Sequence, residues 1–126
     1  MLDHIGIGIS DLARAKSFYD KALAPLGVTL IMEVTAEQTG SEAGAGYGSN
    51  GKPYFWIGGG AVARAHVAFV AETRAMVDDF YKAALAAGGT DNGGPGLRPY
   101  YHPNYYGAFV LDPDGHNIEA VCHLPE

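Results

Sequence analysis

The chain has little of several features that mark whole classes of protein. It contains a single cysteine, Cys122, which excludes an internal disulfide. Its 8 Lys and Arg residues are outnumbered by 14 Asp and Glu residues. The resulting net charge of −6 would repel a phosphate backbone, so we expect no nucleic-acid partner. No apolar run is long enough to span a membrane, and residues 1–4 carry an acid where a secretory leader would be basic. We therefore expect a soluble, cytoplasmic protein without a membrane partner.

The sequence does contain an internal repeat. A shift of 62 positions, without a gap, superimposes His4 on His66, Phe18 on Phe80, Tyr19 on Tyr81, Leu23 on Leu85 and Gly27 on Gly89. Eight of the 24 positions from residue 4 to residue 27 are identical in the two copies, which indicates a duplicated unit. At 126 residues the chain is too short for two independent cores. We therefore predict one domain, residues 1–126, made of module one (1–60) and module two (61–126).

The first half reads as a strand, a helix and further strands. Apolar and small residues alternate in residues 4–9, as in a strand with two different faces. Ser10-Asp11 can cap a helix whose apolar residues continue to Gly27. Residues 28–33 and 54–57 read as strands, and the second of them is entered by the turn Asn50-Gly51. The Gly-rich residues 39–52 read as a loop or a short edge strand.

The second half repeats this order. A strand begins at His66, Thr73 can cap the next helix, and Gly88-Gly89 can end it. Residues 106–123 read as a hairpin around the turn 112–115, while the strand content of residues 91–103 stays open. The fold class that we predict is α+β, with two βαβββ modules whose sheets pair around a cavity.

Three residues are candidate metal ligands because each lies on the strand face that is opposite to the large apolar side chains. His4 is followed on its face by Gly6 and Gly8, and His66 is followed by Ala68. Glu119 shares its face with Asn117 and Val121, while Ile118, Ala120 and Cys122 face the opposite way. Small side chains beside a polar one leave room, which favours a cavity over helix packing. Two imidazoles and one carboxylate form a facial triad that leaves metal positions open for a substrate. The alternative is a cavity whose polar groups only orient a ligand.

The other three histidines are weaker candidates. His116 lies in the predicted turn, and His123 is four residues beyond Glu119 in its strand. His102 lies in an irregular stretch, where it can line the rim of the pocket. We expect all three at the surface.

These residues give the chain a resemblance to a known family. The histidine pair, the Phe-Tyr on each helix and the segment 112–119 (DPDGHNIE) resemble the vicinal oxygen chelate superfamily, in its short glyoxalase and bleomycin-resistance branch. The resemblance covers essentially the whole chain and implies the paired-module fold. It also implies that His4, His66 and Glu119 are ligands of a divalent metal ion, with Zn, Ni, Co, Mn and Fe all open.

The resemblance does not extend to a fourth ligand. Glyoxalase I has an acid on the last strand of its first module. Alignment of the turn Asn50-Gly51 with Asp114-Gly115 puts Phe55 at that position, and the shift of 62 positions puts Ile57 there. We therefore expect a metal-dependent glyoxalase-like lyase or isomerase and not glyoxalase I itself. The alternatives are an Fe(II) extradiol-type dioxygenase and a metal-free drug-binding resistance protein.

The same resemblance implies a small-molecule substrate and a homodimer, with modules paired within one chain or between two. The sequence identifies no catalytic base. The residues that we expect around the pocket are Phe55, Ile57, Tyr101, His102 and Tyr106.

Overall fold

Each half of the chain begins with a strand that leads into a capped helix. The computed structural model describes residues 1–126. Strand β1 (Ile5–Gly8) precedes helix α1 (Leu12–Ala22), and strand β5 (His66–Val70) precedes helix α3 (Arg74–Ala86). The side chain of Asp11 accepts a hydrogen bond from the backbone N–H of Arg14 at 3.1 Å, and Thr73 accepts one from Met76 at 3.2 Å. Both predicted caps are confirmed.

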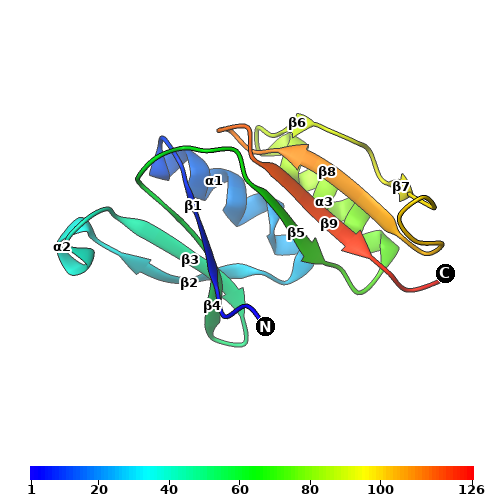
Figure 1. Cartoon of the computed structure of the whole chain (residues 1–126), viewed down its shortest axis with the longest axis horizontal. Helices are drawn as coiled ribbons and strands as arrows, with labels where there is room; N and C mark the ends of the chain where they lie inside the picture. The colour runs from blue at the N-terminus through cyan, green and yellow to red at the C-terminus, as the bar shows by residue number, and fades with distance from the viewer.

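The strands form two separate sheets. In module one the order is β1-β4-β3-β2, with β2 at Thr29–Val34, β3 at Gly44–Ser49 and β4 at Lys52–Gly58. In module two the order is β5-β9-β8-β6, with β6 at Thr90–Asp91, β8 at Tyr106–Leu111 and β9 at Asn117–Cys122. The first strand of each module pairs in parallel with the last, and it is an edge strand of its sheet (Figure 1). The predicted α+β fold with two modules is confirmed.

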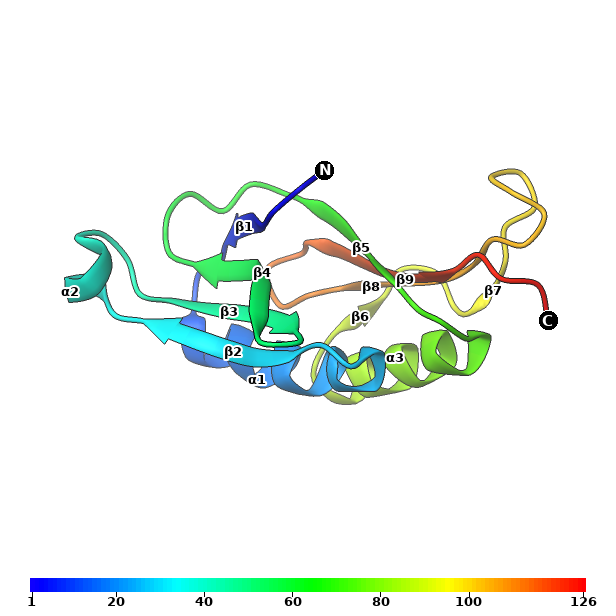
Figure 2. The ribbon, with the colours of Figure 1, turned by 90° about the horizontal axis from the view of Figure 1, so that it is seen from below.

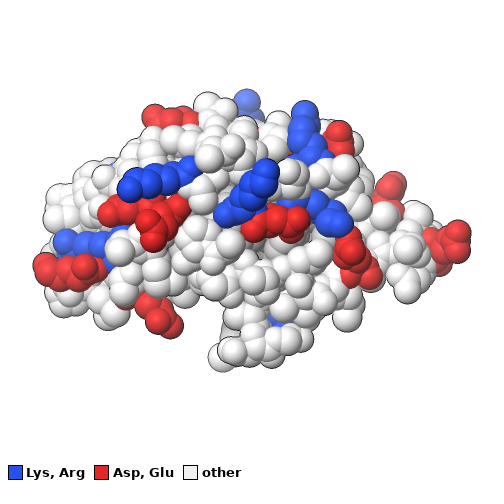
Figure 3. Space-filling model, turned by 180° about the vertical axis from the view of Figure 1, so that it is seen from behind, with Lys and Arg blue, Asp and Glu red and all other residues white.

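Both helices cover the same side of the molecule. Figure 2 shows α1 and α3 beneath the two sheets, whose opposite faces carry no helix. We call these uncovered faces the outer faces. The helix-facing sides of the strands form one core with the helices, in which Phe18, Tyr19, Phe55 and Phe80 are almost completely buried. On the helix side, Lys and Arg alternate with Asp and Glu and form no patch of one sign (Figure 3).

The prediction for the Gly-rich span 39–52 was incomplete. A four-residue helix α2 (Ala36–Thr39) ends where this span begins, and the span contains β3, which is an inner strand between β2 and β4. Its small residues fit this place because Ala45 and Tyr47 pack into the core while Gly44, Gly46 and Gly48 lie on the outer face. The turn after β3 is the predicted one, with positive φ at Asn50 (54°) and Gly51 (75°).

The open stretch of module two contains two short strands. Strand β6 and strand β7 (Gly96–Leu97) both pair antiparallel with β8, and residues 92–95 separate them. The 3-10 turn η1 (Ala24–Leu26) completes the elements of module one. No helix of the structure has both the length and the apolar character needed to cross a membrane.

The turn 112–116 of module two docks onto module one. The Tyr19 hydroxyl donates to Asp112 at 2.6 Å, and Asp114 accepts from the backbone N–H and the hydroxyl of Ser10 at 3.1 and 2.6 Å. We call this turn the clasp. The surface placement predicted for His116 is wrong: it is fully buried, its Nδ1 accepts from the N–H of Ala65 at 3.0 Å, and its Nε2 donates to the carbonyl of Gly8 at 2.8 Å. Nε2 of His116 therefore joins the two modules, while Nδ1 binds the backbone just before β5 within module two.

Candidate metal and ligand site

Two of the three predicted ligands meet on the outer face of module two. Strand β5 pairs with β9 so that His66 lies beside Asn117 and Ala68 beside Glu119. Nε2 of His66 donates to Oε1 of Glu119 at 2.9 Å. The Glu119 side chain is only 2% exposed, whereas that of His66 is 54% exposed. The pair therefore presents an accessible imidazole beside a carboxylate that protein atoms hold in place.

Tyr105 holds the other oxygen of this carboxylate. Its hydroxyl donates to Oε2 of Glu119. The phenol ring lies over Gly107, where a Cβ atom would be 3.1 Å from the ring. Burial, together with the hydrogen bond to Glu119, raises the pKa of Tyr105 far above its usual value. Tyr105 is therefore a neutral hydrogen-bond donor throughout the physiological range.

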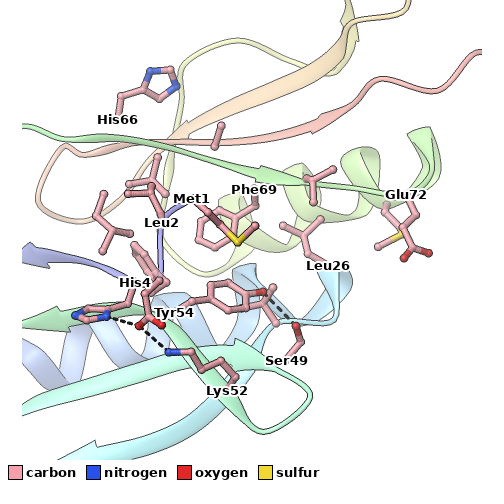
Figure 4. A pocket seen from close by; sticks show the side chains of 18 residues that line it. Met1, Leu2, His4, Leu26, Ser49, Lys52, Tyr54, His66, Phe69 and Glu72 are labelled. Atoms are coloured by element: carbon pink, nitrogen blue, oxygen red, sulfur yellow. Dashed lines mark hydrogen bonds and ion pairs between the residues drawn. The ribbon is translucent and has the colours of Figure 1, made fainter.

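His4 is not part of this group. Its Nδ1 lies 2.7 Å from Oδ1 of Asp3, which also accepts from Lys52 at 2.8 Å. Hydrogen bonds from Lys52 and His4 lower the pKa of Asp3. Figure 4 shows His4 and His66 on opposite walls of a cleft, with His66 turned away from it. Within one chain, no three His, Cys, Asp or Glu residues come close enough together to hold a metal ion.

The His66–Glu119 pair nevertheless has the spacing of two metal ligands. Nitrogen and oxygen ligands bind a divalent transition metal at about 2.1 Å, so two of them at a right angle lie about 3.0 Å apart. The observed 2.9 Å separation fits this arrangement. One chain therefore supplies two suitable donors, and no third His, Cys, Asp or Glu lies beside them within the chain.

The strand pairing corrects the predicted place of the missing fourth ligand. In module one Gly6 lies beside Trp56, just as Ala68 lies beside Glu119 in module two. Because the repeat superimposes Gly6 on Ala68, the counterpart of Glu119 is Trp56 and not Phe55 or Ile57. The side chains of those two residues have the opposite parity and lie in the core, each 1% exposed.

Trp56 lies flat on the outer face of module one. A Cβ atom on Gly46 would stand 2.8 to 2.9 Å from three atoms of the indole ring, so only glycine leaves room for it. The position that corresponds to the carboxylate of module two is thus an aromatic surface without a donor for a metal ion.

The remaining predicted pocket residues are divided between three places. Tyr101 is exposed, and its ring lies 5.0 Å from that of Tyr105, so it borders the site. Tyr106 points to the helix side, where its hydroxyl donates to Asp78 at 2.6 Å. His102 is exposed, and its Nδ1 accepts from the N–H of Asn104 at 3.0 Å.

Arg98 and Phe109 extend the site beyond Glu119. The ring of Phe109 lies beside both His66 and Arg98, with its centroid 6.2 Å from that of the imidazole and 5.5 Å from the guanidinium carbon. Sequence reasoning placed neither residue there. The alternation from Tyr105 through Gly107 to Phe109 was the available signal, because these residues share the parity that faces Glu119 across the hairpin.

The cleft seen in Figure 4 separates the two modules and has a volume of about 790 Å³. Its walls are mostly apolar and include Leu26, Phe55, Phe69 and Met76, while Lys52 and Glu72 line its rim. Phe55 and Phe69 meet edge to face at its floor, 5.2 Å apart. His4 and His66 both line this cleft.

Comparison with known proteins identifies relatives of this fold. Residues 1–120 match the family model described as the Glyoxalase/Bleomycin resistance protein/Dioxygenase superfamily. No curated protein sequence matches the chain.

Several solved structures are similar over the whole chain. A glyoxalase/bleomycin resistance protein from Albidiferax ferrireducens has 29% identity and a TM-score of 0.78, with 99% of both chains covered. A family enzyme from Burkholderia phytofirmans has 20% identity and a TM-score of 0.69, with 97% of this chain and 98% of that chain covered. Glyoxalase I from Zea mays has 24% identity and a TM-score of 0.73, and the match covers 96% of this chain but 45% of that one.

Proposed function

Because the chain belongs to the Glyoxalase/Bleomycin resistance protein/Dioxygenase superfamily, we propose that it is a divalent-metal-dependent, glyoxalase-like enzyme of the lyase or isomerase type. The observation that carries the proposal is the 2.9 Å pair of His66 and Glu119 on an open sheet face. In this proposal the two residues hold the ion together with His4.

We further propose that the third ligand comes from a second copy of the chain. Within one chain His4 is turned to Asp3, and the outer faces of both sheets are uncovered. A homodimer in which module one of one copy faces module two of the other would bring His4 of the partner subunit to His66 and Glu119. The Zea mays glyoxalase I chain is about twice as long as this one, which is consistent with a functional unit of four modules.

The roles of the protein groups follow from their contacts. A bound divalent ion would act as a Lewis acid toward a substrate oxygen. His66 supplies an exposed imidazole nitrogen, and Glu119 supplies a carboxylate from a buried position. Tyr105 fixes the orientation of the carboxylate through its hydrogen bond. Trp56 supplies no acid in place of a fourth ligand, so proton transfer by such an acid is not part of the proposal.

Metal titration of single variants tests this function. We expect one divalent ion per chain in the wild type, measured with Ni²⁺ and Zn²⁺ by calorimetry, and loss of that binding in His66→Ala and in His4→Ala. His123→Ala is the matched control, because His123 is an exposed histidine whose ring packs edge-on against Tyr105. A wild type that takes up no ion would exclude the enzyme and favour the metal-free binding protein.

Mixing the two ligand variants tests the shared site. A dimer of one His4→Ala chain and one His66→Ala chain would contain one intact site if ligands come from both copies, and none if they come from one. We therefore expect refolding of the mixture to restore metal binding that neither variant has alone. Failure to restore it would place the complete site within a single chain.

Extradiol-type dioxygenase chemistry is the second candidate. The observation that favours it is Trp56, because its position leaves a set of two histidines and one glutamate, as non-haem Fe(II) oxygenases use. Oxygen consumption with Fe(II) and catechol separates the two candidates, since a lyase or isomerase consumes no oxygen.

A further inference from the structure

We propose that Arg98 is the specificity-determining residue of this site and that the site accepts a small organic carboxylate. The inference that this carboxylate is a substrate rests on the proposed function. The inference that a carboxylate binds here rests only on the residues around Arg98. Four observations carry it: the fixed guanidinium, its unpaired charge, its link to Tyr105, and the Phe109 ring that it shares with His66.

The guanidinium of Arg98 is fixed by backbone carbonyls. Its two terminal nitrogens donate to Gly96 and Gly94, each at 2.8 Å, and the group stacks over the Phe109 ring. Gly93 leaves the space for this packing, since a Cβ atom there would lie 3.2 Å from Phe109 and 3.3 Å from Arg98. Little further ordering of the side chain is needed to bind a ligand.

The charge of this guanidinium has no partner within the chain. Arg14, Lys16 and Lys52 each lie within ion-pair distance of a carboxylate, but Arg98 does not. A guanidinium has five N–H donors in a fork that matches a carboxylate, and two carbonyls leave some of them free. A half-buried, preorganised and uncompensated cation is suited to bind an anion.

Arg98 is linked to the pair of His66 and Glu119 through Tyr105. Its backbone N–H donates to the carbonyl of Tyr105 at 2.7 Å, and Tyr105 in turn holds Glu119. The positive charge of Arg98 also reaches the phenol, where it acts against the larger effects that raise the pKa of Tyr105. The guanidinium and the carboxylate are therefore two ends of one hydrogen-bonded group.

The spacing suggests the length of the ligand. His66 and the guanidinium both lie beside the ring of Phe109, 6.2 and 5.5 Å from its centroid. A compound that reaches from one to the other would have oxygen donors at one end, a carboxylate at the other and a body about the size of a six-membered ring.

A matched pair of ligands tests the inference. We would measure by calorimetry the affinities of 3,4-dihydroxybenzoate and 3,4-dihydroxybenzamide, which have the same shape and differ in charge. Both are titrated into the wild type with and without Zn²⁺. We expect the acid to bind about ten-fold or more tightly than the amide. Arg98→Met, which retains the length and the packing on Phe109, should abolish this preference, and Arg98→Lys should retain part of it.

Arg64→Met is the control, since Arg64 is an exposed arginine without an ion pair. A purely structural role for Arg98 would lower the melting temperature of Arg98→Met without changing the ratio of the two affinities. Equal binding of acid and amide by the wild type, an unchanged preference in Arg98→Met, or no binding of either compound would each overturn the inference. A preference for the acid without metal uptake would support it while refuting the proposed enzyme.

Discussion

At the scale of single residues, the outer face of module two combines a buried carboxylate with accessible partners. Glu119 is almost completely covered, and both of its oxygens accept hydrogen bonds. A buried carboxylate without such donors would be costly, so Tyr105 and His66 stabilise it as well as orient it. This arrangement makes the tyrosine a positioning residue whose removal should affect both stability and ligand binding.

We expect Tyr105→Phe to weaken metal binding about 10- to 100-fold, as is usual when an outer-shell hydrogen bond is lost. Loss of the donor should also destabilise the fold by about 1.5–3 kcal/mol, because the acceptor is charged and buried. Calorimetric metal titration and urea unfolding measure the two effects. Tyr101→Phe is the control, since Tyr101 is an exposed neighbour in the same loop. Equal behaviour of the two variants would contradict a role for the Tyr105 hydroxyl.

At the scale of elements, strand β3 leaves space for the indole of Trp56, which extends over it from β4. A side chain on Gly46 would collide with the indole, whereas one on Gly6, on the neighbouring edge strand, would make an ordinary contact at 3.8 Å. We expect Gly46→Ala to shift the fluorescence emission of Trp56, the single tryptophan, and Gly6→Ala to leave it almost unchanged. Identical spectra for both variants would show that the indole does not rest on Gly46.

The helix caps give a second prediction at this scale. Removal of an N-cap side chain costs about 1 kcal/mol, so Asp11→Ala should lower the free energy of unfolding by about that amount. Asp11→Ser retains an acceptor for the N–H of Arg14 and should retain most of the stability. Urea unfolding of the two variants checks the difference, and an equal loss in both would indicate that the cap contributes nothing.

The elements that were predictable from sequence are those with a local signal. The caps at Asp11 and Thr73 and the Asn50-Gly51 turn follow from side-chain and backbone chemistry within a few residues. Strand β3 was not predictable because its glycines weaken strand propensity, and only its partners β2 and β4 define it. The meeting of His66 and Glu119 followed from parity, whereas the position of His4 depends on how whole modules pack.

The predicted surface position of His116 was wrong for a related reason. Turns usually lie at the surface, but this one is covered by module one, and nothing within the turn itself encodes that contact. The alignment that chose Phe55 or Ile57 over Trp56 was in error by a single residue, which in a strand reverses the face.

At the scale of the whole molecule, the two modules are joined asymmetrically. The clasp of module two binds Ser10 and Tyr19, near Arg14. The repeat places Glu72 and Met76 of module two where module one has Ser10 and Arg14, and both line the open cleft together with Ser49 and Lys52 of the turn in module one. The cleft is thus the unclosed counterpart of the clasp, and the clasp adds its hydrogen bonds at one junction only to the apolar core that the modules share.

The clasp should therefore weaken in acid. Burial raises the pKa of Asp114, but the hydrogen bonds from Ser10 outweigh it and hold the pKa below the ordinary value of 3.8. A carboxyl whose pKa is lower in the folded state stabilises the fold above the unfolded value, and this stabilisation is lost as the pH falls through the folded value. We expect Asp114→Asn to be less stable than the wild type by about 1–3 kcal/mol at neutral pH.

The difference between the two proteins should then shrink as the pH falls below about 3.8, and it should close as the pH passes the lower pKa that Asp114 has in the folded protein. Urea unfolding at a series of pH values measures it, and subtraction of the two curves removes the groups that titrate equally in both. Asp79→Asn, at an exposed acid of α3, should show a small difference that does not vary with pH. A gap for Asp114→Asn that stayed constant down to the lowest pH would mean that the contribution of Asp114 does not depend on its charge, and that the neutral carboxyl binds Ser10 as well as the carboxylate does.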